Sequence, residues 1–207
     1  MNKKTIILLI FTATLVLSSF SVHSLVINEI MYNPNGTDSG REWIEIYNNG
    51  QSSVDIDGYL FKESGGTHGL TLVQGSTILE PDEYAVIAAD TSLFMADYPS
   101  YSGNLLDSSW ASLANTGEEI TILDNNNVIV DVVNYTDLAE EGYSIELKDP
   151  WSDNNLSINW AQSKLQGGSP GVENGTINSV PDLSFFALFL IFAIGCLMLA
   201  QLSRRVT

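Results

Sequence analysis

The sequence predicts an all-β domain, an antiparallel sandwich or barrel, and two observations lead to this fold class. Short runs such as EWIEIY and VDIDGYLF alternate apolar and polar residues with a period of two. Turn-forming residues, such as Asn33–Gly36, separate these runs about every eight to twelve residues. A period of two is that of strands, and regularly spaced turns are typical of antiparallel sheets.

The first three strands are expected between Leu25 and Phe61. Val26–Met31 is dense enough in apolar residues for a mostly buried strand, with Val26 and Met31 on one side. In the second strand we expect Glu42, Glu45 and Tyr47 to face outward and three residues to face inward: Trp43, Ile44 and Ile46. Val54–Phe61 is predicted as one alternating strand.

The middle of the chain is predicted to contain a loop, two short strands and a central strand. Lys62–Gly69 is rich in glycine and reads as a loop. The two short strands are Leu70–Val73 and Ser76–Leu79. Glu83–Ala89 is apolar at consecutive positions, which is typical of a central strand buried on both faces.

A helical turn and a hairpin are predicted next. Ser92–Tyr98 has helix-like apolar spacing, and Asp90 or Thr91 is suited to cap it. The polar tetrapeptide at 124–127 joins the two strands of a hairpin: Glu118–Leu123 and Val128–Tyr135. Tyr143–Lys148 alternates as a further strand.

Charge excludes one class of partner. The formal net charge is −17, and all 25 carboxylates lie between Leu25 and Asp182, together with only four cationic residues. Nucleic-acid binding depends on neutralising phosphates with lysine and arginine, so we expect no nucleic-acid partner. An acidic surface instead favours cations, basic partners or solubility.

The N-terminus predicts export. Lys3 and Lys4 precede the apolar run Ile6–Leu17, which is typical of a secretory signal peptide over residues 1–24. Small residues before the boundary favour cleavage between Ser24 and Leu25. An uncleaved N-terminal anchor is the alternative.

The C-terminus predicts a membrane anchor. Leu183–Leu202 has no charged residue over 20 positions, the length of a membrane-spanning helix. Arg204 and Arg205 follow in a basic stub at 203–207, which is expected on the cytoplasmic side. We therefore expect a single-pass protein of the cell membrane with residues 25–171 as an outside domain and 172–182 as a linker.

The C-terminal region also resembles a processing signal. A short proline motif formed by Val180, Pro181 and Asp182, an apolar helix and a basic cluster resemble the sorting signals that exosortase- and archaeosortase-type peptidases read. The glutamate that usually follows the proline is Asp182 here. Processing and permanent anchoring are both open, and the intact mass of the cellular protein distinguishes them.

Several stretches of the exported chain together resemble one family. They are Ile27–Ile30, Glu42–Asn48, Val54–Tyr59, Pro81–Ala89, Leu113–Asp124, Tyr143–Glu146, Asn159–Ala161 and Gly168–Gly171. On these residues, about 25–174 is similar to prokaryotic members of the lamin tail domain family. Where the family often has tryptophan this chain has Tyr59, an exchange of one large aromatic residue for another.

The resemblance implies a fold and a class of function. It implies an immunoglobulin-like β-sandwich without catalytic residues, because the family consists of binding and scaffolding modules. We therefore expect no enzyme, but a module for adhesion or envelope organisation with an extracellular protein or polysaccharide partner. Because prokaryotic members often accompany secreted hydrolases, the alternative is an accessory domain that presents substrate to a separately encoded hydrolase.

Three glutamates are the candidate metal ligands. If the first two strands pair, Glu29 and Glu45 approach each other, and with Glu42 they offer oxygen ligands for calcium. The alternative is that these carboxylates form the hydrogen bonds that fix the first hairpin. Other cofactors lack support, because the stretch from Leu25 to Asp182 contains one histidine, His68, and no cysteine.

Two tryptophans and four asparagines are further candidates. Trp110 and Trp151 lie near turns and are expected at the surface, where tryptophan rings can bind sugars. The sequence contains four N-x-[ST] glycosylation sequons, at Asn35, Asn134, Asn155 and Asn174. Asn35 and Asn174 stand in NGT turns, from which a glycan is expected to project.

Overall fold

Two larger sheets and a short ribbon form the fold in residues 25–175, which are the residues that the structure, a computed structural model, describes. The largest sheet contains β13 (Trp160–Gln162), β12 (Ile145–Leu147), β1 (Val26–Met31), β2 (Trp43–Tyr47), β8 (Tyr84–Ala88), β9 (Asn104–Asp107) and β6 (Thr71–Gln74), in that order. The second sheet contains β11 (Ile129–Asn134), β10 (Glu119–Leu123), β4 (Leu60–Glu63) and β5 (Gly66–Gly69). The ribbon pairs β3 (Val54–Asp55) with β7 (Ile78–Leu79).

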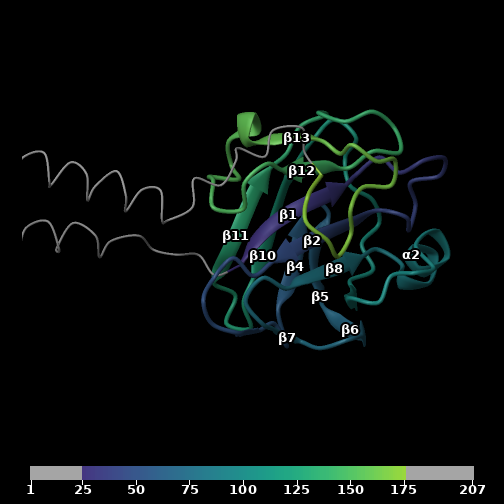
Figure 1. Cartoon of the computed structure of the whole chain (residues 1–207). Coiled ribbons are helices and arrows are strands. Elements are labelled where there is room, and N and C mark those ends of the chain that lie inside the picture. The colour runs from purple at the N-terminus through teal and green to yellow at the C-terminus, as the bar shows by residue number, and fades with distance from the viewer. Residues whose placement is uncertain (1–24, 176–207) are drawn as a thin grey trace, which may run out of the picture.

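The two larger sheets pack face to face and enclose the main core (Figure 1). The inner face of the seven-stranded sheet contributes Ile30 and Ile44, and the four-stranded sheet contributes Phe61 and Ile122, all fully buried. These apolar side chains recur at alternate positions along each strand because successive side chains point to opposite faces. The predicted antiparallel sandwich is therefore observed, with one parallel pair, β8 and β9.

The outer face of the seven-stranded sheet is also covered. The helix α2 (Thr91–Asp97) lies over one end of this face, where Phe94 packs edge-on against Trp43 with ring centroids 6.0 Å apart. The predicted cap is confirmed at Asp90, whose carboxylate accepts hydrogen bonds from the backbone of Ser92 and Leu93. The part of the outer face formed by β1, β2 and β12 is crossed by residues 163–175, here called the C-terminal strap, which appears yellow-green in Figure 1.

Two stretches differ from the elements expected for them. Val54–Phe61 is not one strand, because a turn closed by the hydrogen bond from Tyr59 N to Ile56 O separates β3 from β4. Gly58 lies in this turn at φ +75°, a conformation that glycine adopts without steric cost. Lys62–Gly69 is not a loop, because β4 and β5 pair across it as a tight hairpin.

The facing of the first two strands also differs from the expectation. Val26 belongs to the main core cluster and Met31 to the outer cluster under α2, and a register shift lies between Ile27 and Glu29. Trp43 likewise faces outward, opposite to Ile44. Every residue of β1 and β2 is nonetheless buried, since both faces of these strands are covered.

The strap extends the ordered domain beyond its predicted end at residue 171. Asn174, in the predicted linker, donates hydrogen bonds to the backbone oxygens of Asn28 and Leu147. The predicted signal peptide, the remainder of the linker, the apolar segment at 183–202, the sorting motif and the basic stub lie outside the described residues. Within residues 25–175, the helical segments are too short to cross a membrane.

Candidate functional site

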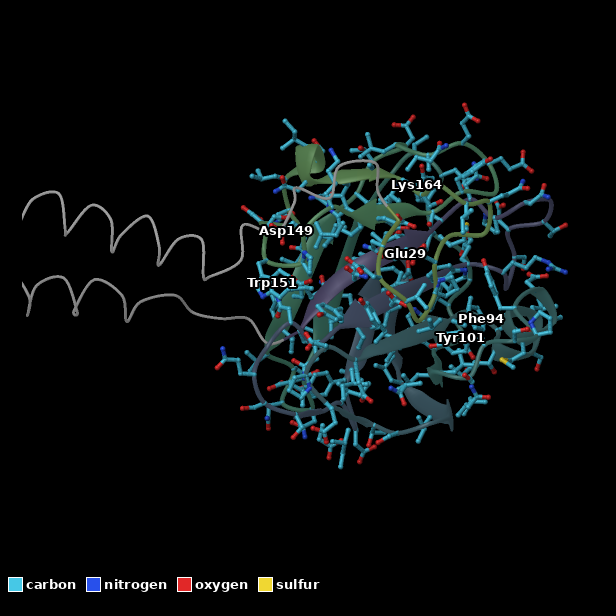
Figure 2. All side chains as sticks on the ribbon, viewed as in Figure 1. Glu29, Phe94, Tyr101, Asp149, Trp151 and Lys164 are labelled. Carbon is cyan, nitrogen blue, oxygen red and sulfur yellow. The ribbon has the colours of Figure 1, made fainter. Side chains whose placement is uncertain are left out.

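Three glutamates form a row across the middle of the outer face. Glu29 on β1 is the cross-strand partner of Glu45 on β2 and of Glu146 on β12. All three side chains are at most 1% exposed. Figure 2 shows Glu29 near the centre of the domain, with Trp151 towards one end and Phe94 and Tyr101 towards the other. This row is here called the glutamate row.

The C-terminal strap supplies most of the hydrogen-bond donors to the glutamate row. Ser169 donates through its backbone N–H to Glu29 Oε1 at 2.8 Å and through its hydroxyl to Glu146 Oε1 at 2.8 Å. Gly171 donates its N–H to Glu45 Oε2 at 2.6 Å. From the sheet itself, the Ser144 hydroxyl donates to Glu29 Oε1 at 2.5 Å. The row therefore binds the chain's own backbone and seats the strap on the sheet.

Burial makes these carboxyl groups weak acids. Burial is the main cause that raises the pKa of Glu29 from 4.5 to about 8, and the nearby charge of Glu146 adds to it. The hydrogen bonds from Ser144 and Ser169 lower the pKa but do not offset these two causes. Burial and the charge of Glu29 raise the pKa of Glu45 well above its ordinary value. Burial also raises the pKa of Glu146. Protons are therefore retained in the row near neutral pH, where separate carboxyl groups in water are ionised.

Glu42 does not join the other two predicted calcium ligands. It is buried at the end of the main core, where its Oε2 accepts hydrogen bonds from Trp110 Nε1 at 3.0 Å and from Leu113 N at 2.8 Å. Burial raises the pKa of Glu42 to about 7. Within the described part of the chain, no group of three or more histidine, cysteine, aspartate or glutamate side chains has an arrangement that could hold a metal ion.

The two predicted surface tryptophans differ in their environments. Trp110 is 4% exposed and packs against Phe61 with ring centroids 4.7 Å apart, so the expected surface position is wrong. Its position near a turn does not expose it, because its N–H is the partner that buried Glu42 requires. Trp151 is 66% exposed.

The four sequon asparagines also separate into two groups. Asn35, Asn134 and Asn155 are exposed. Asn174 does not project, because its amide nitrogen lies 2.9 Å from Leu147 O and 3.0 Å from Asn28 O as a donor to both. A glycan would replace one of the two hydrogens on that nitrogen and would therefore remove at least one of these hydrogen bonds.

A small pocket lies at the end of the outer face away from α2. Its volume is about 220 Å³, and it is lined by Asn28, Tyr47, Asp82, Tyr84, Leu147, Lys148, Pro150, Trp151, Glu173 and Asn174. Tyr47 and Tyr84 are cross-strand partners on β2 and β8, with ring centroids 4.6 Å apart. This aromatic pocket was not predicted from the sequence, because its lining comes from five segments far apart in the chain.

A second hollow lies between α2 and the strap. It has a volume of about 710 Å³, and Tyr98, Tyr101, Leu165 and Pro170 are among its lining residues. The Tyr98 hydroxyl donates to Gly167 O at 2.7 Å, which ties the helix end to the strap along one wall of the hollow.

Comparison with models of known protein families identifies the family of this chain. A search of curated proteins found no match. The family model described as Lamin Tail Domain matches residues 18–137. This match ends before β12, whereas the ordered sandwich continues through β12, β13 and the strap. Since the matched residues make up more than half of the chain and coincide with most of the sandwich, this protein belongs to the lamin tail domain family.

Proposed function

We propose that this protein is a non-catalytic, membrane-anchored module that acts outside the cell in adhesion or envelope organisation. The family supports the general class, because lamin tail domains are binding and structural modules. The charge-free stretch Leu183–Leu202 with Arg204 and Arg205 after it supports the anchor, and the N-terminal pattern supports export.

One observation favours a binding module over an enzyme. Each buried glutamate of residues 25–175 accepts hydrogen bonds from the chain itself; these residues are Glu29, Glu42, Glu45, Glu63 and Glu146. A general acid or base must instead reach the substrate within hydrogen-bond distance. These carboxyl groups bind neighbouring segments of the sandwich and its strap, which supports a structural role for them.

Localisation tests the first part of the proposal. The full chain with a tag placed after Gly36, in an exposed turn, is expressed in its own host and the cells are fractionated. We expect recovery in the membrane fraction and loss of the tag when intact cells are treated with protease. A tag that stays protected in intact cells, or a protein found only in the soluble fraction, would contradict export and anchoring.

Partner recovery tests the second part. Cross-linking on intact cells followed by purification of the tagged chain is expected to recover an envelope protein or polysaccharide. Recovery of a secreted hydrolase would favour the accessory role, in which this domain presents substrate to that enzyme. Turnover of polysaccharides by the purified chain alone would contradict a non-catalytic module.

A further inference from the structure

The geometry points to the aromatic pocket as a binding site for an organic ammonium group, such as a lysine side chain or a quaternary amine. This inference rests on the proposed function and names the ligand class of the binding module. The pocket combines three aromatic residues, Tyr47, Tyr84 and Trp151, with two carboxylates, Asp82 and Glu173. Rings with nearby carboxylates are the combination that recognises alkylammonium ions, because the faces of aromatic rings attract cations.

The tyrosine wall of the pocket is rigid. Tyr47 and Tyr84 pack against each other at an interplanar angle of 31°, and the Tyr47 hydroxyl donates to Asp82 Oδ1 at 2.8 Å. Tyr47 is only 6% exposed, so its position is set by the sheet. A wall that is already ordered loses little conformational entropy when a ligand binds.

Asp82 lies in the left-handed region of backbone conformation. Its φ is +65°, in a turn closed by the hydrogen bond from Glu83 N to Glu80 O. Glycine and asparagine are common at a position of this kind, and aspartate also tolerates it. Here the aspartate supplies a carboxylate beside Tyr47 that glycine could not supply.

The opposite wall is held in place by bonds from neighbouring segments. Asn49 donates through its side chain to Pro150 O at 2.6 Å, and Trp151 N donates to Asp149 Oδ1 at 3.0 Å. The ring of Trp151 remains 66% exposed, which leaves its surface accessible to a ligand. On the strap, the hydrogen bonds of Asn174 fix the backbone next to Glu173.

The charges at the pocket favour a cation over an anion or a neutral sugar. Lys148 is the one cationic residue in the lining, and its ammonium group donates to Ile158 O at 2.7 Å. Burial raises the pKa of Tyr84 to about 12, together with the charges of Glu45, Glu173 and Asp82, of which the last two line the pocket. The volume of about 220 Å³ suits a single head group, since sites for drug-sized ligands are larger.

Calorimetric titration of the full chain in detergent tests this site. The probes are choline, Nα-acetyl-lysinamide and 3,3-dimethyl-1-butanol, the neutral isostere of choline. We expect choline or the lysine derivative to bind on the order of tenfold more tightly than the neutral isostere. Preference between the two cations distinguishes a quaternary head group from a protein side chain. Addition of 1 M sodium chloride is expected to weaken binding by screening the carboxylates.

Two variants and one control locate the binding. Trp151→Ala and Asp82→Asn are each expected to weaken cation binding on the order of tenfold without changing the melting temperature, since Trp151 is exposed and asparagine tolerates positive φ. Asp137→Asn removes an equal charge from an exposed position outside the pocket and is expected to leave binding unchanged. Acrylamide quenching gives a second readout, because Trp151 is exposed and the other three tryptophans are buried.

Two results would overturn the inference. Equal binding of choline and its neutral isostere would show an apolar pocket without cation recognition, and binding of a neutral disaccharide in place of both cations would show a sugar site. Either result would leave the localisation and partner experiments unaffected. The inference and the proposed function therefore fail separately.

Discussion

At the central strands β1 and β2, the two faces of the seven-stranded sheet are equally buried but are stabilised by different interactions. On β2, Ile44 faces the sandwich core and Glu45 faces the strap, and both are 0% exposed. Ile44 lies among apolar side chains that need no particular orientation of their neighbours. Glu45 needs a donor at each oxygen, which Asn28 and Gly171 supply. Burial alone therefore does not define a core. The stability of one face depends on the packing of apolar side chains, and that of the other depends on hydrogen-bond donors and protons.

The largest effect is expected from truncation on the inner face. Ile44→Ala should lower the free energy of unfolding by about 2–5 kcal/mol, because it removes buried methyl groups and leaves a cavity. Chemical denaturation measures the loss. Ile44→Val is the matched control and should cost about 0.5–1.5 kcal/mol. A loss below 1 kcal/mol for the alanine variant would mean that the inner face is not the main source of stability.

On the outer face, the close approach of the strap can be tested at a glycine. Gly168 has φ +75°, and an added Cβ would lie 2.2 Å from Glu29 Oε1 and 2.6 Å from Ser144 Oγ. Gly168→Ala should therefore destabilise by about 2–4 kcal/mol through backbone strain and overpacking together. Faster proteolysis within residues 163–175 should accompany this loss.

A second glycine separates these two causes. Gly36 has φ +89° with no atom within 4 Å of an added Cβ, so Gly36→Ala should cost only the strain of about 1–2 kcal/mol. If both variants lose the same free energy of unfolding, the strap does not pack closely against the glutamate row.

The pH dependence of stability should come from the outer face. In the unfolded chain Glu29 has its ordinary pKa of 4.5, and in the folded chain its pKa is about 8. Between these values the folded state holds a proton that the unfolded state has released, so stability is full below pH 4.5 and is lost as the pH rises through about 8. Glu42, with a pKa of about 7, acts in the same direction.

A melting curve at each pH measures this effect. One unit of raised pKa corresponds to about 1.4 kcal/mol, and a chain of this size shifts by about 2–4 °C per kcal/mol, so we expect a fall of at least about 3–5 °C from pH 5 to pH 8. Glu29→Gln keeps an uncharged side chain of the same shape and should reduce the fall in melting temperature, although Glu42, Glu45 and Glu146 still contribute to it. A melting temperature that rises from pH 5 to pH 8 would contradict the inference that the glutamate row holds protons near neutral pH.

The smallest effect is expected from calcium. The oxygens of Glu29 and Glu45 are occupied by donors of the chain, and Glu42 lies in the main core. Millimolar calcium should therefore change the melting temperature by less than about 1 °C relative to chelator, because only binding to the folded state raises it. A saturable rise of several degrees would show a metal site on one of the two faces.

Local patterns were sufficient for most of the fold. The alternation in β2 and the continuous apolar run of β8 predicted strands at the correct places, and the capped helix after Asp90 was also predicted. The separate clusters of Val26 and Met31 were not predicted, because the register shift between Ile27 and Glu29 interrupts the alternation of β1 between them. A period of two indicates which residues share a face, but it does not reveal whether another segment covers that face.

The candidate site was less accessible to prediction for the same reason. Glu29 and Glu45 were identified from pairing of the first hairpin, but Glu146 joins them from β12 more than a hundred residues later. Glu45 was expected in solvent, and its cover is supplied by Gly171 of the strap. Trp110 was expected at the surface, but it is buried and donates its N–H to buried Glu42, from a segment distant in the chain.

The side chain of Asn174 also determines how the domain carries mechanical load. Tension applied at Gly175 does not first reach the edge strand β13, which could be peeled from the sheet one hydrogen bond at a time. Asn174 transfers it to Asn28 on β1 and Leu147 on β12, two strands inside the sheet. The hydrogen bonds of this one side chain to two interior strands are therefore loaded before those of the edge strand.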